Sequence, residues 1–111
     1  MSQTILSESE ILDLNGALTY QSGGIVSRTV LKQQAGSVTA FAFDAGQELS
    51  EHTCPHDALL HVVEGEGIVT IDGHRHKVAS GQMIRLPANV PHAVQARQQF
   101  KMLLTMLKAR E

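Results

Sequence analysis

The chain has 111 residues, of which 42% are hydrophobic, and a formal net charge of -2. This length corresponds to one domain, residues 1–111, which buries roughly two-thirds of the surface of its unfolded chain. The basic residues are scattered and no apolar run approaches a membrane span, so we expect neither a nucleic-acid partner nor a membrane. The single cysteine, and an N-terminus without a basic start or an apolar run, predict a cytoplasmic protein without a secretory signal.

The first third of the chain predicts an N-terminal arm, residues 1–22, followed by strands. A helix start is indicated only in the arm, where Ser7 precedes Glu10 by three residues in the pattern of a capping box. The segment 25–33 is β-branched at its start and reads as a strand with an exposed edge. Residues 38–43 alternate with the period of two that is typical of a strand. The two faces of that strand are Thr39, Phe41 and Phe43 on one side, and Val38, Ala40 and Ala42 on the other.

The remaining segments also predict short strands. Residues 58–65 are almost continuously apolar, which indicates a strand covered on both faces. Asp72 and Gly73 are a strong signal for a two-residue turn, so residues 67–78 are predicted as a hairpin. Residues 82–96 read as a strand, a proline-rich turn and a second strand. In 100–111 the apolar positions step by two, which favours a strand over the helix that Met, Leu and Lys also permit.

Many short strands, with Gly and Pro turns and no long helix, predict an all-β sandwich or barrel. The strands do not alternate with convincing helices, which argues against a parallel α/β sheet.

Two spaced patterns stand out in the second half of the chain. In the first, residues 46–65, Gly46 is followed after five residues by His52, and Gly65 closes the pattern. In the second, residues 81–96, Gly81 is followed in a fixed register by Pro87 and His92. Residues 66–80, fifteen in number, separate the two patterns.

On these residues the chain resembles the cupins, which are small antiparallel double-sheet barrels of jelly-roll type. The resemblance implies a single cupin domain whose barrel core spans residues 36–111. The family's metal site is a set of three histidines and one glutamate that point into the barrel, and this chain matches two of the four positions, His52 and His92. Cys54 stands at the second histidine and Ala58 at the glutamate. In the second pattern Asn89 replaces a glycine and Ala96 an asparagine.

Other side chains offer alternatives for the missing ligands. Cys54 shares a strand face with His52, and Zn or Fe accepts mixed nitrogen and sulfur ligands. His56 is a further candidate, and Asp57 would face inward only if the strand slipped by one residue. The other interpretation is a metal-free barrel in which the two histidines bond to each other or to water. The cofactor prediction is therefore either none, or a divalent transition metal (Fe, Zn, Mn or Ni) at His52, His92 and Cys54 or His56.

Other polar residues favour structural interpretations. His74 and His76 read as polar residues of a hairpin strand, and His61 as a packed or interface histidine. Cys54 as a nucleophile would need a base such as His52 or His92, and no oxyanion donor is recognisable. A solvated turn is the interpretation for Glu64 and Glu66.

Three functions follow, and the sequence leaves them open. The first is binding of a small molecule in the barrel. The pocket would be lined by Phe41, Phe43, Met102 and Leu104, with His52, Cys54 and His92 as its few polar groups. The second is a metal-dependent dioxygenase or isomerase with His52 and His92 as ligands, as the cupin resemblance allows. The third is a structural protein without a ligand. The resemblance also implies a homodimer formed along the strand predicted at 25–33.

Overall fold

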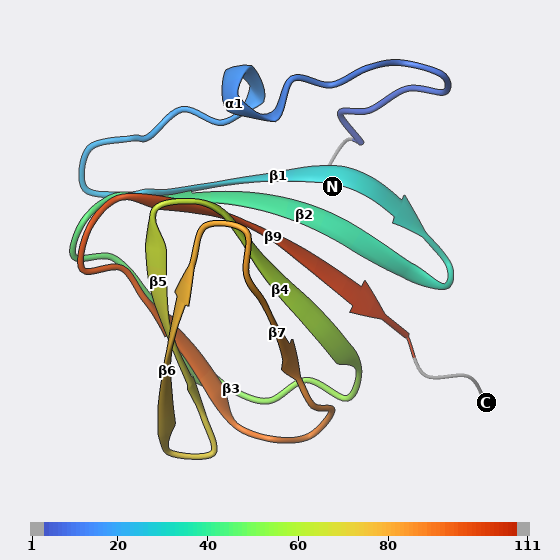
Figure 1. Cartoon of the computed structure of the whole chain (residues 1–111). Helices are drawn as coiled ribbons and strands as arrows, with labels where there is room; N and C mark the ends of the chain where they lie inside the picture. Colours follow the sequence, from blue (N-terminus) through green and yellow to red (C-terminus); the bar gives the residue numbers. More distant parts are fainter. Residues whose placement is uncertain (1–3, 109–111) are drawn as a thin grey trace.

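The computed structural model describes residues 4–108 of the chain. Within this range there are two antiparallel sheets, a larger one with the strand order β1-β2-β9-β4-β7 and a smaller one with the order β3-β8-β5-β6. The sheets pack against each other (Figure 1), which confirms the predicted all-β jelly-roll barrel. The described elements are α1 (Leu14–Ala17), β1 (Ile25–Gln33), β2 (Gly36–Phe43), β3 (Glu48–His52), β4 (Asp57–Glu64), β5 (Glu66–Ile71), β6 (His74–Ala79), β7 (Met83–Leu86), β8 (His92–Gln95) and β9 (Phe100–Leu107).

The larger sheet is apolar on both faces, and β2 shows why. Phe43 is fully buried in the core between the two sheets, and Phe41 packs against that core. Ala40 and Ala42 belong to a second apolar cluster on the outer face of the sheet, beneath the N-terminal arm. The alternation predicted from the sequence is therefore confirmed, because each set of residues has its own apolar layer to face.

Phe100, at the start of β9, is a centre of the core between the sheets. Its ring stacks on that of Phe43, with centroids 4.6 Å apart and an interplanar angle of 15°. A Cβ atom at Gly67 would lie 2.7 Å from the Phe100 ring. Gly65 has a φ of +78°, and a Cβ atom there would lie 2.9 Å from the Cβ of Phe100. Both glycines are required by this close approach, and the strand predicted at the C-terminal end is confirmed as β9.

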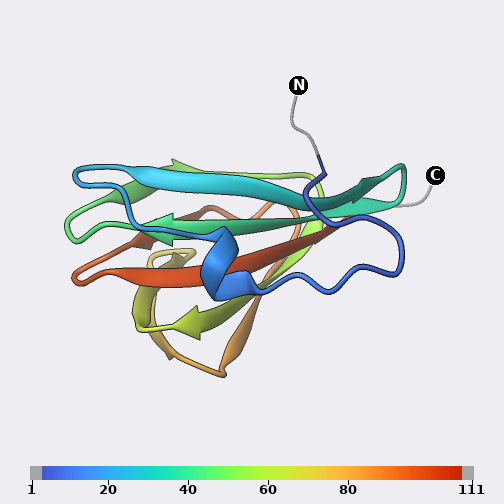
Figure 2. The same ribbon diagram turned by 90° about the horizontal axis from the view of Figure 1, so that it is seen from above.

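The N-terminal arm crosses the outer face of the larger sheet, as the two views show (Figures 1 and 2). Leu18 is fully buried in the cluster beneath it.

The helix start predicted at Ser7 is wrong. The Ser7 N–H does donate to Oε1 of Glu10 at 2.9 Å, but Ser9 has a φ of 59°. A left-handed residue cannot continue a right-handed helix, so the segment makes a turn and a helix forms only at α1.

The hairpin predicted around Asp72 and Gly73 is confirmed by β5 and β6. Asp72 has a φ of 51° and Gly73 a φ of 82°, so both turn residues lie in the left-handed region, as a type I′ turn requires. Asn89, which stands at a glycine position of the cupin pattern, has a φ of 65°. The helix α1 has four residues, and no helix within residues 4–108 has the length and apolar character needed to cross a membrane.

Candidate functional site

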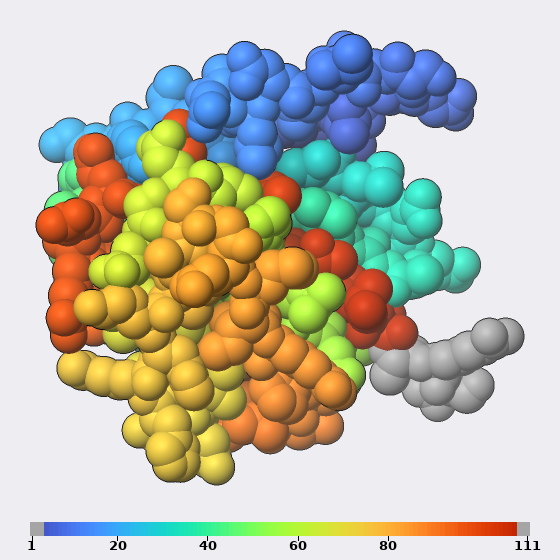
Figure 3. Space-filling model, viewed as in Figure 1, coloured from blue at the N-terminus to red at the C-terminus, as the bar shows by residue number. Residues whose placement is uncertain are grey.

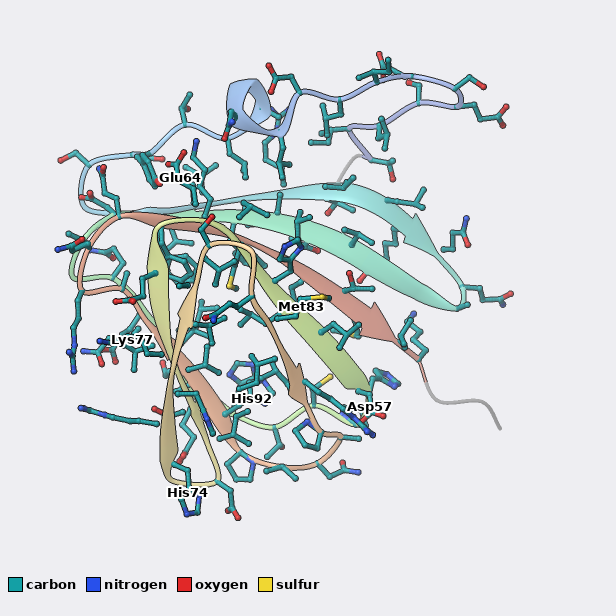
Figure 4. All side chains as sticks on the ribbon, in the orientation of Figure 1. Asp57, Glu64, His74, Lys77, Met83 and His92 are labelled. Atoms are coloured by element: carbon teal, nitrogen blue, oxygen red, sulfur yellow. The ribbon has the colours of Figure 1, made fainter. Side chains whose placement is uncertain are left out.

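Two histidines meet on the inner face of the smaller sheet. His52 ends β3 and His92 begins β8, and the two residues are direct cross-strand partners. Their ring centroids are 4.4 Å apart, with an interplanar angle of 68° that makes an edge-to-face contact. His92 lies between the two sheets (Figure 4) and is 7% exposed, whereas His52 is exposed at the end of β3. The convergence that the motif spacing predicts is therefore present.

Backbone carbonyls fix the orientation of both rings. Nδ1 of His52 lies 2.7 Å from the carbonyl oxygen of Ser50, and Nδ1 of His92 lies 3.2 Å from that of Val90. A carbonyl only accepts, so each Nδ1 donates, and in a neutral ring this leaves Nε2 as an acceptor. Burial is the main cause that lowers the pKa of His92; the Val90 contact opposes it, and the neighbouring His52 adds a smaller lowering. His92 is therefore neutral at neutral pH.

Two loops form the rim beside the histidine pair, residues 53–56 before β4 and residues 87–91 before β8. The Asn89 N–H donates to the carbonyl oxygen of Cys54 at 2.7 Å. The Asp57 carboxylate accepts from the Ala88 N–H at 2.8 Å and from Arg85 at 2.8 Å. The Ala88 N–H is the main cause that lowers the pKa of Asp57, and Arg85 contributes in the same direction. These bonds hold the two loops together on either side of the histidines.

The sequence model of the cupin domain matches residues 40–107. The chain belongs to the cupin family. No curated protein matches this cupin, but solved structures do. A conserved protein of unknown function from Streptococcus pyogenes is 33% identical, with a TM-score of 0.90 over 100% of this chain and 97% of the other.

Two further structures support the assignment. A cupin 2 conserved barrel domain protein from Leptotrichia buccalis is 39% identical, with a TM-score of 0.84. That alignment covers 87% of this cupin and 47% of the other chain. An RmlC-like cupin from Shewanella frigidimarina is 25% identical, with a TM-score of 0.76 over 98% and 95% of the two chains.

The family's metal site is only half represented in this cupin. Ala58, at the glutamate position, is buried in the apolar core. Both oxygens of Asp57 are bound at the rim, so the strand slippage that would turn Asp57 inward has not occurred. Within residues 4–108 no group of three His, Cys, Asp or Glu side chains is placed to hold a metal ion. Protein sites for Zn and similar metals use three or four side-chain ligands, and the donors present do not match such a site.

Cys54 and His56, the other candidate ligands, both lie in the rim loop before β4. Each is half-buried. Cys54 takes part in the rim through its backbone carbonyl, which accepts from Asn89.

The apolar residues predicted for the pocket occupy two depths. Phe43 and Met102 are fully buried within the core, whereas Phe41 and Leu104 are half-buried against it. Leu49, Ile71 and Ile84 share this half-buried position. Ile71 was missed by the sequence analysis although it is the cross-strand partner of His92. Only the strand order, in which β5 lies next to β8, reveals that neighbour.

The other histidines agree with their structural interpretations. His74 and His76 are exposed on β6, and His74 lies at the hairpin tip, away from the barrel interior (Figure 4). His61 is half-buried on β4, opposite Leu103 and Met83. Leu59, His61 and Val63 are all half-buried, so the outer face of β4 is only partly covered.

The solvated turn predicted for Glu64 and Glu66 is confirmed in part: both flank the bend at Gly65 and Glu66 is exposed, but the Glu64 side chain, which is 45% exposed, also has partners. The Glu64 carboxylate accepts from the hydroxyl of Tyr20 in the arm and pairs with Nζ of Lys101 at 3.7 Å. Lys101 is 6% exposed, and its Nζ lies 5.0 Å from the Tyr20 ring centroid. Burial and the Glu64 contact raise the pKa of Tyr20. The three residues come from distant segments, so no local sequence pattern predicts the cluster.

Proposed function

We propose that this cupin binds a small organic molecule at the open end of the barrel, where His52 and His92 meet. The observation that carries the proposal is the pair of rings in contact, each held through Nδ1. Neither Nε2 has a hydrogen-bond partner within residues 4–108. Two ring nitrogens of neighbouring imidazoles are thus left for a ligand.

The surroundings of the pair support an organic ligand. Ile71, the cross-strand partner of His92, and Leu49, on the same strand as His52, are half-buried against the apolar core. Small-molecule sites combine apolar walls, which give affinity, with sparse polar atoms, which give orientation. The neutral His92 favours a ligand group that donates a hydrogen bond, such as a hydroxyl or an amide N–H.

The other functions predicted from the sequence stay predictions. A metal-dependent dioxygenase or isomerase would need donors beyond the two imidazoles. For the structural dimer, β1 is an edge strand of the larger sheet, and the Ile5 N–H bonds to the Thr29 carbonyl oxygen at 2.9 Å along it. The pairing of two copies along β1 rests on the resemblance alone.

A thermal-shift screen of small hydroxylated and amide-bearing molecules tests the proposal, using protein purified without added metal. A ligand present at about 100 times its Kd adds about 2.7 kcal/mol to the free energy of unfolding, so binders raise the Tm clearly. We expect His52→Ala to lose this response because one acceptor is gone. The control, His76→Ala, removes an exposed histidine of β6 and should respond as the natural protein does.

Two results would contradict the proposal. One is a screen in which no molecule raises the Tm. The other is a set of binders that stabilise His52→Ala as strongly as the natural protein. Metal analysis of the same preparations separates the alternative, because stoichiometric metal that is lost in His52→Ala would favour the metal-dependent enzyme.

A further inference from the structure

A hollow lies on the outer face of the smaller sheet. It has a volume of about 230 Å³ and is lined by Glu66 and Ile68 of β5 and by Arg97 and Gln98 of the loop between β8 and β9. Val69, the next residue of β5, is buried in the inner core, so Ile68 and Glu66 face outward. The loop before β9 stands beside the strands of the smaller sheet at the left of the molecule (Figures 1 and 3). The hollow is therefore separate from the histidine site.

The hollow presents opposite charges that do not neutralise each other. Glu66 and Arg97 both line it, yet within residues 4–108 neither side chain forms an ion pair or a hydrogen bond. Lys77, the cross-strand partner of Ile68, is likewise without an ion-pair partner among the described residues. Ile68 is only 6% exposed and supplies an apolar floor between the two charges.

These charges decide the class of ligand. A simple anion would pair with Arg97 but would be repelled by the Glu66 carboxylate. A simple cation would pair with Glu66 but would be repelled by Arg97. A molecule with both charges satisfies both groups. The volume of about 230 Å³ corresponds to about eight water molecules at about 30 Å³ each, which suits a small zwitterion.

From this arrangement we infer that the hollow binds a zwitterion of the α-amino acid type with a small apolar side chain. Arg97 binds the carboxylate through paired N–H donors, a geometry that the guanidinium favours. Glu66 accepts from the ammonium group. The apolar side chain of the ligand lies on Ile68, and the Gln98 amide is placed to complete the hydrogen bonds.

The test is a titration of the isotope-labelled full-length protein with L-valine, followed through its backbone amide NMR signals. We expect saturable shifts confined to residues 65–68 and 97–99. Arg97→Gln and Glu66→Gln should each weaken binding by about tenfold or more, because each removes a charge-assisted hydrogen bond. Arg75→Gln removes a positive charge from β6 on the same face without lining the hollow, and it should bind L-valine unchanged.

Two ligand controls make the inference specific. Isovalerate and isobutylamine keep the carbon skeleton of valine but lack the ammonium or the carboxylate, and both should bind much more weakly. Isovalerate binding as tightly as L-valine would reduce the hollow to an anion site and overturn the inference. So would an absence of shifts, or unchanged affinity in Arg97→Gln. Shifts around His52 and His92 alone would also overturn it, while leaving the proposed function standing.

Discussion

Cys54 and Ala58 decide what the histidine pair can hold. Both stand where the cupin pattern has metal ligands, and Ala58 is buried among apolar residues. Replacing them by the family residues, Cys54→His with Ala58→Glu, restores three imidazoles and a carboxylate. We expect the double variant to purify with about one divalent transition metal per chain, measured by elemental analysis, because four ligands then converge.

The matched control for this variant is Cys54→His with Ala58→Gln, which has nearly the same shape but no carboxylate. It should hold metal more weakly. A folded double variant that contains no metal would show that position 58 does not face the two histidines.

Single residues also mark the limits of the sequence analysis. The pairing of His52 and His92 could be predicted from the sequence, because the fixed spacing of two motifs placed both on neighbouring strands. The bonds of Glu64 could not be predicted from the sequence, because its partners Tyr20 and Lys101 come from the arm and from β9. A carboxylate after a strand reads as solvated until the packing of distant segments is known.

At the scale of elements, the rim loops keep the histidines in place. Asp57 holds the loop before β8 through the Ala88 N–H, and Arg85 binds the other carboxylate oxygen. We expect Asp57→Ala to speed hydrogen exchange at the Ala88 amide and to weaken ligand binding at the histidine pair. Exchange measured by NMR and the thermal-shift response check the two effects. Arg85→Gln, the control, leaves the Ala88 bond in place and should keep the amide protected.

The pH dependence of the rim follows from the lowered pKa of Asp57. The carboxylate is more acidic in the folded chain than in the unfolded one, so its contribution to the free energy of unfolding is complete above about pH 4. It is lost as the pH falls further through the folded pKa. Slow exchange at Ala88 in Asp57→Ala at neutral pH would contradict this role.

Most strands were predictable because their faces differ, as in β2, where aromatic residues alternate with alanines. The helix expected near Ser7 was wrong because a local capping pattern competes with packing. Leu6 and Leu12 of that segment lie against the sheet, and the turn at Ser9 allows this. The strand order could not be predicted from the sequence, because pairs such as β2 with β9 join segments far apart in the chain.

For the molecule as a whole, the arm is part of the folded unit. Leu18 is fully buried under it, whereas Ile11 of the same arm is 96% exposed. We expect Leu18→Ala to lower the free energy of unfolding by about 2–5 kcal/mol, since it leaves a cavity between arm and sheet. Ile11→Ala, the matched control, should change it by no more than about 0.5 kcal/mol. Urea unfolding measures both, and equal stabilities would mean that the arm is not docked in solution.

Gly67 on β5 and Phe100 on β9 constrain each other across the core. The phenyl ring fills the space that a side chain at 67 would need, so Gly67 cannot be exchanged while the ring remains, whereas a side chain at 65 would meet the Gln99 carbonyl oxygen and the Cβ of Phe100 instead. A lineage that shortens the residue at 100 gains room at 67 but loses the stacking on Phe43. Drift at these sites is therefore expected to proceed as compensated double changes, and a comparison of diverged homologues would reveal it as covariation.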